Sequence, residues 1–335
     1  MLKLCLPAPG LDWIQVGITT HCNAGCIYCP SRVYRSSWQA RHMEFELFSR
    51  FVSGLKNVDL IYLQGWGEPF LHPDFWRMLG LVKEKGFLAG CTSNANLLDS
   101  DTLKRLVDEG LDVLALSLAG ANAQENDRIR QGTSFRQVTR AIEDLHRIKA
   151  QQGSDKPGLH LAYMLLRHGL EDLDQLPGLF LDLGIEHVVI SSLSLPLSSE
   201  LESQAQLADS PQEYSELKQQ MAELFNSQKL QGTVFAHLYN PFQEPGECTE
   251  NVRRAFCLSP EGRVTPCVFT QIPAGPYAVY RHQGREYPLQ QTDYGNIAQQ
   301  DLKRIWYGRE YRRFRRKLDL EMCFRCAKNR IDTQL

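Results

Sequence analysis

Three cysteines, Cys22, Cys26 and Cys29, follow an apolar, strand-like run with the spacing CxxxCxxC. Three thiolates can bind three irons of a [4Fe–4S] cluster, which leaves the fourth iron open to a small ligand. An open iron indicates chemistry, because a cluster that only stores or relays electrons takes a fourth cysteine. A structural zinc site is the alternative, since closely spaced cysteines also bind zinc and His21 or His42 could supply a fourth ligand.

A second set of cysteines lies near the C-terminal end of the sequence. Cys248 and Cys267 flank a turn at Gly262, and Cys323 and Cys326 form a CxxC pair. Four thiolates are enough for one complete auxiliary [4Fe–4S] cluster. Nine residues follow Cys326 and none is a cysteine, so a single auxiliary cluster is predicted.

Three other cysteines have weaker assignments. Cys257 lies four residues before Gly262, where it is a packed core thiol or a replacement for Cys248 as cluster ligand. Cys5 and Cys91 have no partner in the sequence, so both are expected to be buried structural thiols.

The cysteine loop, the run from Cys22 to Pro30 with Tyr28 before its third cysteine, resembles the cluster loop of the radical S-adenosylmethionine (SAM) superfamily. That resemblance implies that Tyr28 packs beside the adenine of SAM. The run Gly65–Pro69 resembles the family's Gly-Gly-Glu motif, which holds the amino group of the cofactor's methionine moiety. It implies Gly67, Glu68 and Pro69 as cofactor-binding residues, and a carboxylate at a strand end can accept hydrogen bonds from an ammonium group.

The remaining cofactor contacts are expected at the ends of later strands. Asn94 and Ser117 end two strand-like runs, where their side chains suit ribose or carboxylate contacts, with helix capping or turn formation as the alternative. Arg130 stands where family members use an arginine to bind the cofactor carboxylate, and a solvated arginine at a helix end is the other interpretation. The segments around Cys248 to Cys326 resemble the SPASM or twitch auxiliary domain of the same superfamily, in its shortened, twitch-like form.

Short aliphatic runs alternate with amphipathic ones through the first 192 residues, which predicts a parallel sheet with right-handed crossovers. The six strand-like runs are Trp13–Thr19, Leu60–Leu63, Phe87–Thr92, Val113–Ser117, Leu159–Leu165 and His187–Ser191. The helical candidates are Glu44–Leu55, Asp74–Lys85, Asp101–Glu109, Phe135–Lys149 and Leu170–Leu183. Six units match the α/β fold of the radical SAM family, a partial (β/α)6 TIM-like barrel. A variable linker with one helix is expected at 193–234, and a small SPASM/twitch-type cluster-binding domain at 235–335.

Composition sets outer limits on function. The chain has 335 residues, 43% of them apolar and 23% charged, and a formal net charge of −2, as in an ordinary globular protein. Nothing in the bulk charge indicates nucleic acid, and no run approaches the roughly 18 apolar residues of a membrane span. The cytosol is the expected compartment, because clustered rather than dispersed cysteines favour metal binding over disulfides. The segment from Lys303 to Lys317 contains eight basic residues, four aromatic residues and one acidic residue. This composition favours a helix that packs its aromatic side chains inward, and a helix that docks an acidic flavodoxin or ferredoxin is the functional alternative.

The resemblance implies a radical SAM enzyme that cleaves SAM reductively to a 5′-deoxyadenosyl radical and abstracts hydrogen from its substrate. A peptide, protein or cofactor substrate is expected, so the chain would act as a maturase, and the stretch from Val264 to Arg316 looks closest to maturases of tungsten-containing aldehyde oxidoreductases. Twenty-one residues precede Cys22, too few for a leader-peptide-binding domain. A twitch-type dehydrogenase of a small metabolite and a non-catalytic two-cluster electron carrier are the alternatives, and Glu68 argues against the carrier.

Overall fold

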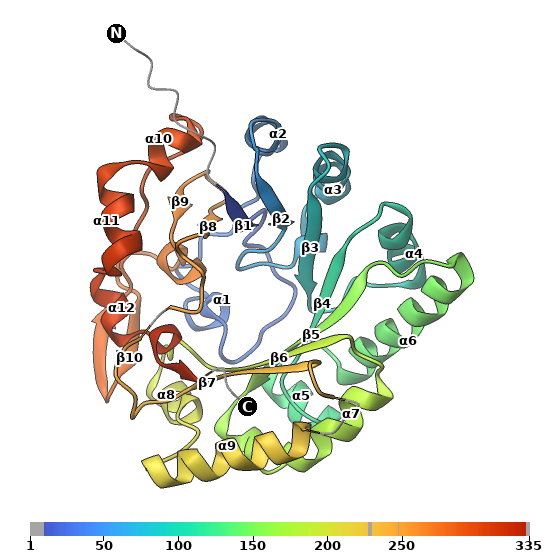
Figure 1. The fold of residues 1–335 in the computed structure, drawn as a ribbon, viewed down its shortest axis with the longest axis vertical. Coiled ribbons are helices and arrows are strands. Elements are labelled where there is room, and N and C mark those ends of the chain that lie inside the picture. The colour runs from blue at the N-terminus through green and yellow to red at the C-terminus, as the bar shows by residue number, and fades with distance from the viewer. Residues whose placement is uncertain (1–9, 227–229, 247, 333–335) are drawn as a thin grey trace.

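A curved, ten-stranded sheet forms the centre of the computed structural model, which describes residues 10–226, 230–246 and 248–332 (Figure 1). Six parallel strands follow one another across the sheet in chain order. They are β1 (Leu11–Val16), β2 (Val58–Tyr62), β3 (Leu88–Ser93), β4 (Val113–Leu118), β5 (Gly158–Leu165) and β6 (His187–Ser192). All six predicted strands are present, and the partial barrel is confirmed.

The sheet continues beyond both ends of this six-stranded unit. Strand β7 (Val234–Tyr239) pairs in parallel with β6, and β8 (Ala255–Leu258) pairs in parallel with β1. Two short antiparallel strands close the edges, β12 (Ile331–Asp332) beside β7 and β9 (Val264–Thr265) beside β8. Residues after 234 therefore extend the barrel sheet at both edges, a pairing between distant segments that the local patterns did not indicate.

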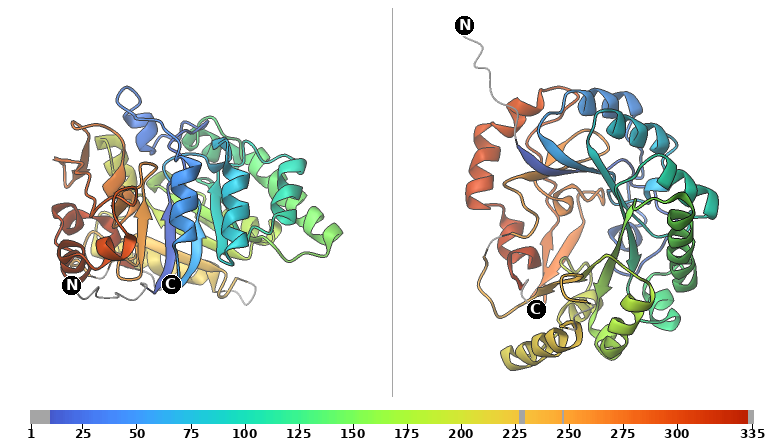
Figure 2. Two further views of the ribbon diagram at one scale, coloured as in Figure 1. Left: turned by 90° about the horizontal axis from the view of Figure 1, so that it is seen from above. Right: turned by 45° about the vertical axis from the view of Figure 1, so that its right-hand side comes forward.

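Helices cover the outer side of the curved sheet (Figures 1 and 2). Those of the first six units are α2 (Phe45–Ser53), α3 (Phe75–Glu84), α4 (Ser100–Asp108), α5 (Ala123–Ile129), α6 (Phe135–Gln152) and α7 (Leu176–Asp182), whereas the short helix α1 (Pro30–Val33) lies inside the curve of the sheet. Gly153 ends α6 in the left-handed region at φ +62°, as a glycine C-cap does. The single helix expected over Leu170–Leu183 is instead a pair of short 3-10 turns, η2 (Arg167–Leu170) and η3 (Leu173–Gln175), that lead into α7.

The segment expected as a linker packs closely against the rest of the chain. It contains two helices, α8 (Ser199–Ala205) and α9 (Pro211–Phe225), where one had been predicted. Leu193, Leu195 and Leu197 are buried in a cluster that also takes in residues of the C-terminal part of the chain. The alternating leucines thus join two parts of the chain, which the polar composition around them concealed.

The C-terminal part consists of short elements that run from β8 and β9 toward α8 and β7 (Figure 1). They are η4 (Val268–Gln271), the hairpin β10 (Val279–His282) and β11 (Arg285–Pro288), α10 (Leu302–Trp306), α11 (Arg309–Lys317), α12 (Glu321–Arg325) and η5 (Ala327–Asn329). The basic helix expected from Lys303 to Lys317 is broken into α10 and α11 at Gly308, which is the N-cap of the second helix.

One large apolar cluster fills the space between the sheet and its helices. Cys91 on β3 is fully buried in it, as expected for a structural thiol, whereas Cys5 lies outside the described residues. No helix in the described part of the chain has the length and hydropathy needed to cross a membrane.

Candidate functional site

The three cysteines of the CxxxCxxC run lie in the loop between β1 and α2, at the carboxyl end of the first strand, where barrel folds place their sites. Cys29 is the N-cap of α1, Cys26 is buried, and Cys22 is exposed. Desolvation raises the pKa of Cys29 and raises that of Cys22 to about 11, and the neighbouring thiols add to both rises, Cys26 and Cys29 at Cys22 and Cys26 at Cys29. The loop therefore gathers three sulfur donors whose protons a metal centre would displace.

The histidines that offered a zinc alternative have other contacts. The rings of His21 and His42 stack with centroids 4.3 Å apart, and His42 meets the ring of His72 edge-on at 4.9 Å. Among the described residues, no three His, Cys, Asp or Glu side chains are arranged to hold a single metal ion. The two histidines pack against each other and against His72 beside the cysteine loop.

The loop after β2 lies directly against the cysteine loop. A Cβ atom on Gly67 would lie 2.4 Å from the carbonyl oxygen of His21, and one on Gly65 would lie 2.8 Å from the Cα of Gly17. The backbone N–H of Glu68 donates to the same His21 oxygen at 2.8 Å, and Pro69 then starts η1 (Pro69–Leu71). Glycine is required at both positions because only bare backbone fits there.

Glu68 is a deeply buried carboxyl group with a fixed orientation. Its side chain accepts hydrogen bonds from the hydroxyl of Ser93 and from the backbone N–H of Asn94, both at 2.8 Å. Burial raises the pKa of Glu68 to about 7, although these hydrogen bonds and the charge of Arg130 act in the opposite direction. An ammonium group placed beside this carboxyl would restore its ionised form.

Asn94 connects the end of β3 to the cysteine loop. Its side-chain nitrogen donates to Oδ1 of Asn23 at 2.9 Å and lies 3.8 Å from the sulfur of Cys22. Ser117, near the end of β4, lines a cavity together with Asn94 and Cys22. The two residues predicted from strand ends are thus brought to the cysteines.

Arg130 is buried at the end of α5 and points toward the cysteine loop. Its Nη1 donates to the hydroxyl of Tyr28 at 2.5 Å, so the tyrosine expected beside an adenine also positions this guanidinium. The Nε atom of Arg130 is buried and has no hydrogen-bond partner within the part of the chain that the structure describes. A buried donor without a partner is costly, so this atom is suited to an anionic ligand.

These residues line one cavity of about 310 Å³ at the carboxyl ends of the strands. The first side of the cavity is formed by the residues already described. The opposite side is formed by Gln15, Gln64, Met164, Ser191, Ser192, Leu193, Ser194, Leu195, Val268, Phe269 and Lys328. The sequence analysis missed this second group, although Gln15 and Gln64 have a recognisable signal, an amide at the end of an apolar strand.

Trp66 ties the loop after β2 to the C-terminal part of the chain. Its indole N–H donates to the carbonyl oxygen of Val268 at 3.0 Å, and its ring lies 6.0 Å from that of Phe269. Both partners directly follow Cys267 in η4. Trp66 stands where the Gly-Gly-Glu motif has its first glycine. Its contacts with Val268 and Phe269 help to close the cavity.

The four C-terminal cysteines of the predicted auxiliary site come together in space. Burial raises the pKa of Cys248, Cys267, Cys323 and Cys326, to about 12 for the last two. In each of the six pairs of these thiols, the negative charge of one contributes to the raised pKa of the other. Cys257, the alternative ligand, is buried on β8, where its thiol donates to Oε1 of Gln15 at 3.7 Å. Of the four other thiols, only Cys267 contributes to the raised pKa of Cys257. These mutual charge effects favour Cys248 over Cys257 as the fourth member of the predicted set.

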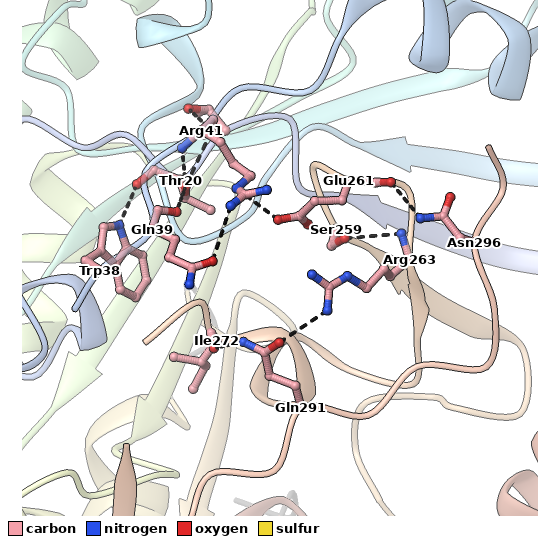
Figure 3. A network of polar contacts seen from close by, with 11 residues as sticks. Thr20, Trp38, Gln39, Arg41, Ser259, Glu261, Arg263, Ile272, Gln291 and Asn296 are labelled. Atoms are coloured by element: carbon pink, nitrogen blue, oxygen red, sulfur yellow. Dashed lines mark hydrogen bonds and ion pairs between the residues drawn. The ribbon is translucent and has the colours of Figure 1, made fainter. Parts of the chain in front are cut away.

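The turn before Cys267 is fixed by a network that reaches the cysteine loop (Figure 3). Gly262 has φ +84°, and a Cβ there would lie 2.9 Å from Oδ1 of Asn296. The amide of Asn296 donates to the carbonyl oxygen of Glu261 at 2.9 Å, and Glu261 forms an ion pair with Arg41 at 3.0 Å. The network thus joins the turn at Gly262 to Thr20 and Arg41, which precede and follow the cysteine loop in the sequence.

Comparisons with known proteins agree with this geometry. The model of the radical SAM superfamily matches residues 16–176, and that of the SPASM iron–sulfur cluster-binding domain matches residues 248–327. A tungsten-containing aldehyde ferredoxin oxidoreductase cofactor-modifying protein from Pyrococcus furiosus is 24% identical over 91% of this chain and 83% of its own length. The mycofactocin maturase MftC of Mycobacterium ulcerans is 25% identical over 48% of this chain and 42% of its own length. The solved structure of anSMEcpe with bound AdoMet has a TM-score of 0.67 at 16% identity and covers 93% of this chain and 84% of its own.

Proposed function

This chain belongs to the radical SAM superfamily and carries a C-terminal SPASM domain, and from that premise we propose that it matures an enzyme cofactor by hydrogen abstraction inside the 310 Å³ cavity. One observation carries the proposal: the cysteine loop, Glu68 and Arg130 line the same cavity as Val268, Phe269 and Lys328, which lie next to the auxiliary thiols in the sequence. A substrate between them would face both cofactor sites. The cofactor-modifying relative, which matches nearly the whole chain, supports a cofactor as the substrate.

The SAM-binding half of the cavity follows from its donors and acceptors. When bound, SAM and the [4Fe–4S] cluster supply reductive cleavage of the sulfonium and a carbon radical that takes hydrogen from the substrate. We assign the cluster to Cys22, Cys26 and Cys29, and the cofactor's ammonium to the buried carboxyl of Glu68. The unpartnered Nε of Arg130 is suited to its carboxylate, with Tyr28 as the positioning residue.

The second half of the cavity would hold the substrate. We assign one auxiliary [4Fe–4S] cluster to Cys248, Cys267, Cys323 and Cys326. Lys328, two residues after the last of these, lines the cavity and forms an ion pair with Glu250 at 3.0 Å. A lysine held beside the thiols can donate to a polar substrate group while its own charge remains neutralised by Glu250.

A small acidic ferredoxin or flavodoxin is the reductant that we propose, in the cytosol, where thiols stay reduced. The first experiment measures 5′-deoxyadenosine formed by anaerobically reconstituted protein with SAM and dithionite. Product should disappear when Cys22, Cys26 and Cys29 are all replaced by alanine, and should persist in the matched variant Cys91→Ala, whose thiol is in the core. If the wild type forms no product with both clusters loaded, the enzyme assignment fails.

The substrate is tested separately with the same preparation. Addition of the organic cofactor extracted from a tungsten-containing aldehyde oxidoreductase should accelerate 5′-deoxyadenosine formation and change the mass of that cofactor. Unchanged cofactor, with 5′-deoxyadenosine still formed, would reject this substrate and retain the enzyme.

A peptide substrate is the second candidate, and a second cavity favours it. This cavity, of about 420 Å³, shares Leu193, Ser194 and Leu195 with the first and extends along the β10–β11 hairpin. A chain longer than one residue could thus place a side chain at the SAM half and its flanking residues along the hairpin. Mass loss in a peptide encoded near this gene, dependent on SAM, would favour this candidate over the cofactor.

A further inference from the structure

Positive charge is concentrated in one short segment of an otherwise acidic chain. Eight of the 37 Lys and Arg residues, but one of the 39 Asp and Glu residues, lie in the segment from 303 to 317. The rest of the chain therefore has 29 basic and 38 acidic side chains, a formal net charge of −9, while the segment alone carries +7. Such segregation generates a local positive potential that the net charge of −2 conceals.

The charges of α11 form one outward face. Arg309, Arg312 and Arg316 are exposed and follow the spacing i, i+3, i+7, which places them on one side of the helix. Within the described residues none of the three forms an ion pair; Arg316 instead donates to the backbone oxygen of Arg312 at 3.3 Å. Like charges at these spacings destabilise a helix, so folding alone does not favour this face. We call these three residues the cationic face.

The opposite side of α11 packs toward the auxiliary thiols. Tyr311 and Phe314 are buried there, and the ring of Tyr311 stacks on that of Tyr294 with centroids 4.2 Å apart. Cys323 packs against the apolar cluster that contains Tyr311 and Phe314. The backbone N–H of Tyr294 donates to the carbonyl oxygen of Val264, three residues before Cys267, at 2.9 Å. A helix with its side chains is about 10–12 Å across. One helix and one aromatic layer therefore separate the cationic face from the auxiliary site.

From this arrangement we infer that the cationic face is the docking surface for a small acidic iron–sulfur electron carrier, which exchanges electrons with the auxiliary cluster through the aromatic layer. In each encounter one electron leaves the reduced centre of the carrier and reduces the auxiliary cluster by one, and no bond is formed or broken. The inference rests on the proposed function, because it requires a cluster at the four C-terminal thiols. Charge complementarity selects the partner, since an acidic carrier is attracted to this face and repelled by the rest of the surface.

The test compares two double charge reversals in the reconstituted holoenzyme. Arg312→Glu with Arg316→Glu changes the cationic face, and Lys56→Glu with Arg136→Glu makes the same change in net charge at exposed positions outside it. The probe is a reduced, acidic plant-type [2Fe–2S] ferredoxin. Its dissociation constant is measured at low and high salt, and its electron transfer is followed by stopped-flow absorbance.

The first variant should weaken ferredoxin binding and slow electron transfer at least tenfold at low salt, and should lose most of the salt dependence of the wild type. The control variant should behave as the wild type. Both should form 5′-deoxyadenosine with dithionite at the wild-type rate, because dithionite does not need the docking face; loss of that activity would be a failure of the proposed function instead. Thermal unfolding of both variants checks that α11 still folds.

Three outcomes overturn the inference. Unchanged binding and electron transfer in the first variant would show that the carrier docks elsewhere. Equal losses in both variants would show that only net charge matters. Tighter binding of duplex DNA than of ferredoxin, abolished by the same two substitutions, would assign the cationic face to nucleic acid.

Discussion

Replacement of Glu68 by glutamine tests two separate effects of this buried carboxyl group. One is its effect on the free energy of unfolding, and the other is its effect on the affinity for SAM. The side chain is 2% exposed, and its pKa rises from an ordinary value of 4.5 to about 7 because burial disfavours the charged form. Below pH 4.5 the group is protonated in both the folded and the unfolded chain, so it costs nothing. As the pH rises toward 7 the unfolded chain loses the proton while the folded chain keeps it, so the free energy of unfolding falls.

The magnitude follows from the same two values. Each tenfold change in proton affinity corresponds to about 1.4 kcal/mol, so the full cost above pH 7 is about 3 kcal/mol, of which roughly 2.5 kcal/mol develops between pH 5 and pH 8. Glutamine has no proton to lose, and it can still accept from the N–H of Asn94 and meet the hydroxyl of Ser93. Between pH 5 and pH 8 the wild type should therefore lose about 2.5 kcal/mol in its free energy of unfolding that the Glu68→Gln variant keeps.

Urea unfolding of the metal-free, reduced protein at pH 5 and pH 8 measures this difference, with Glu143→Gln on the exposed side of α6 as the matched control. In the cluster-loaded protein the same Glu68→Gln substitution should weaken SAM binding by about 1.5–3 kcal/mol, tenfold to over a hundredfold, because a charged hydrogen bond to the ammonium is lost. A stability difference that does not change with pH would refute the raised pKa. Unchanged SAM affinity would refute the role of Glu68.

Three further substitutions test other parts of the site. Cys248→Ala should lower the iron content of reconstituted protein by up to four atoms and retain the other four, whereas Cys257→Ala should retain all eight; the reverse result would exchange the two ligands. Arg130→Lys should weaken SAM binding at least tenfold in calorimetry, because a lysine has no fork to bind Tyr28 and a carboxylate together, and unchanged affinity would contradict this role. Gly67→Ala should abolish cluster loading in the iron assay with the fold retained by circular dichroism, since its Cβ would lie 2.4 Å from a backbone oxygen, and normal loading would mean that the loop can shift.

The site was predictable where its chemistry is local in sequence. Cys22, Cys26 and Cys29 lie within eight residues, and any fold that exposes their loop brings them together. Glu68, Asn94 and Ser117 were found because parallel strands all end at one edge of the sheet, so polar residues at those ends converge. For Arg130 the sequence left ligand binding and solvent exposure open, and burial of its Nε without a partner favours the first.

Other parts of the site depend on contacts between residues far apart in the chain. The choice between Cys248 and Cys257 could not follow from spacing, because it depends on which thiol faces Cys323 and Cys326 after the C-terminal part of the chain folds back. Lys328 gave no signal either, since a lysine beside a CxxC pair is ordinary until a cavity forms next to it.

The sequence by itself determined the strand and helix order, the two sets of cysteines and the glycines that must lie in tight loops, because periodicity and ligand spacing act over a few residues. The tertiary structure alone decided that β7 and β8 extend the barrel sheet, that Leu193 to Leu195 form a wall shared by two cavities, and that Tyr311 and Phe314 of α11 are buried while its arginines at 309, 312 and 316 are exposed. These features arise from strand pairing and burial between segments separated by tens to hundreds of residues, and a linear pattern holds no record of which distant surfaces will meet.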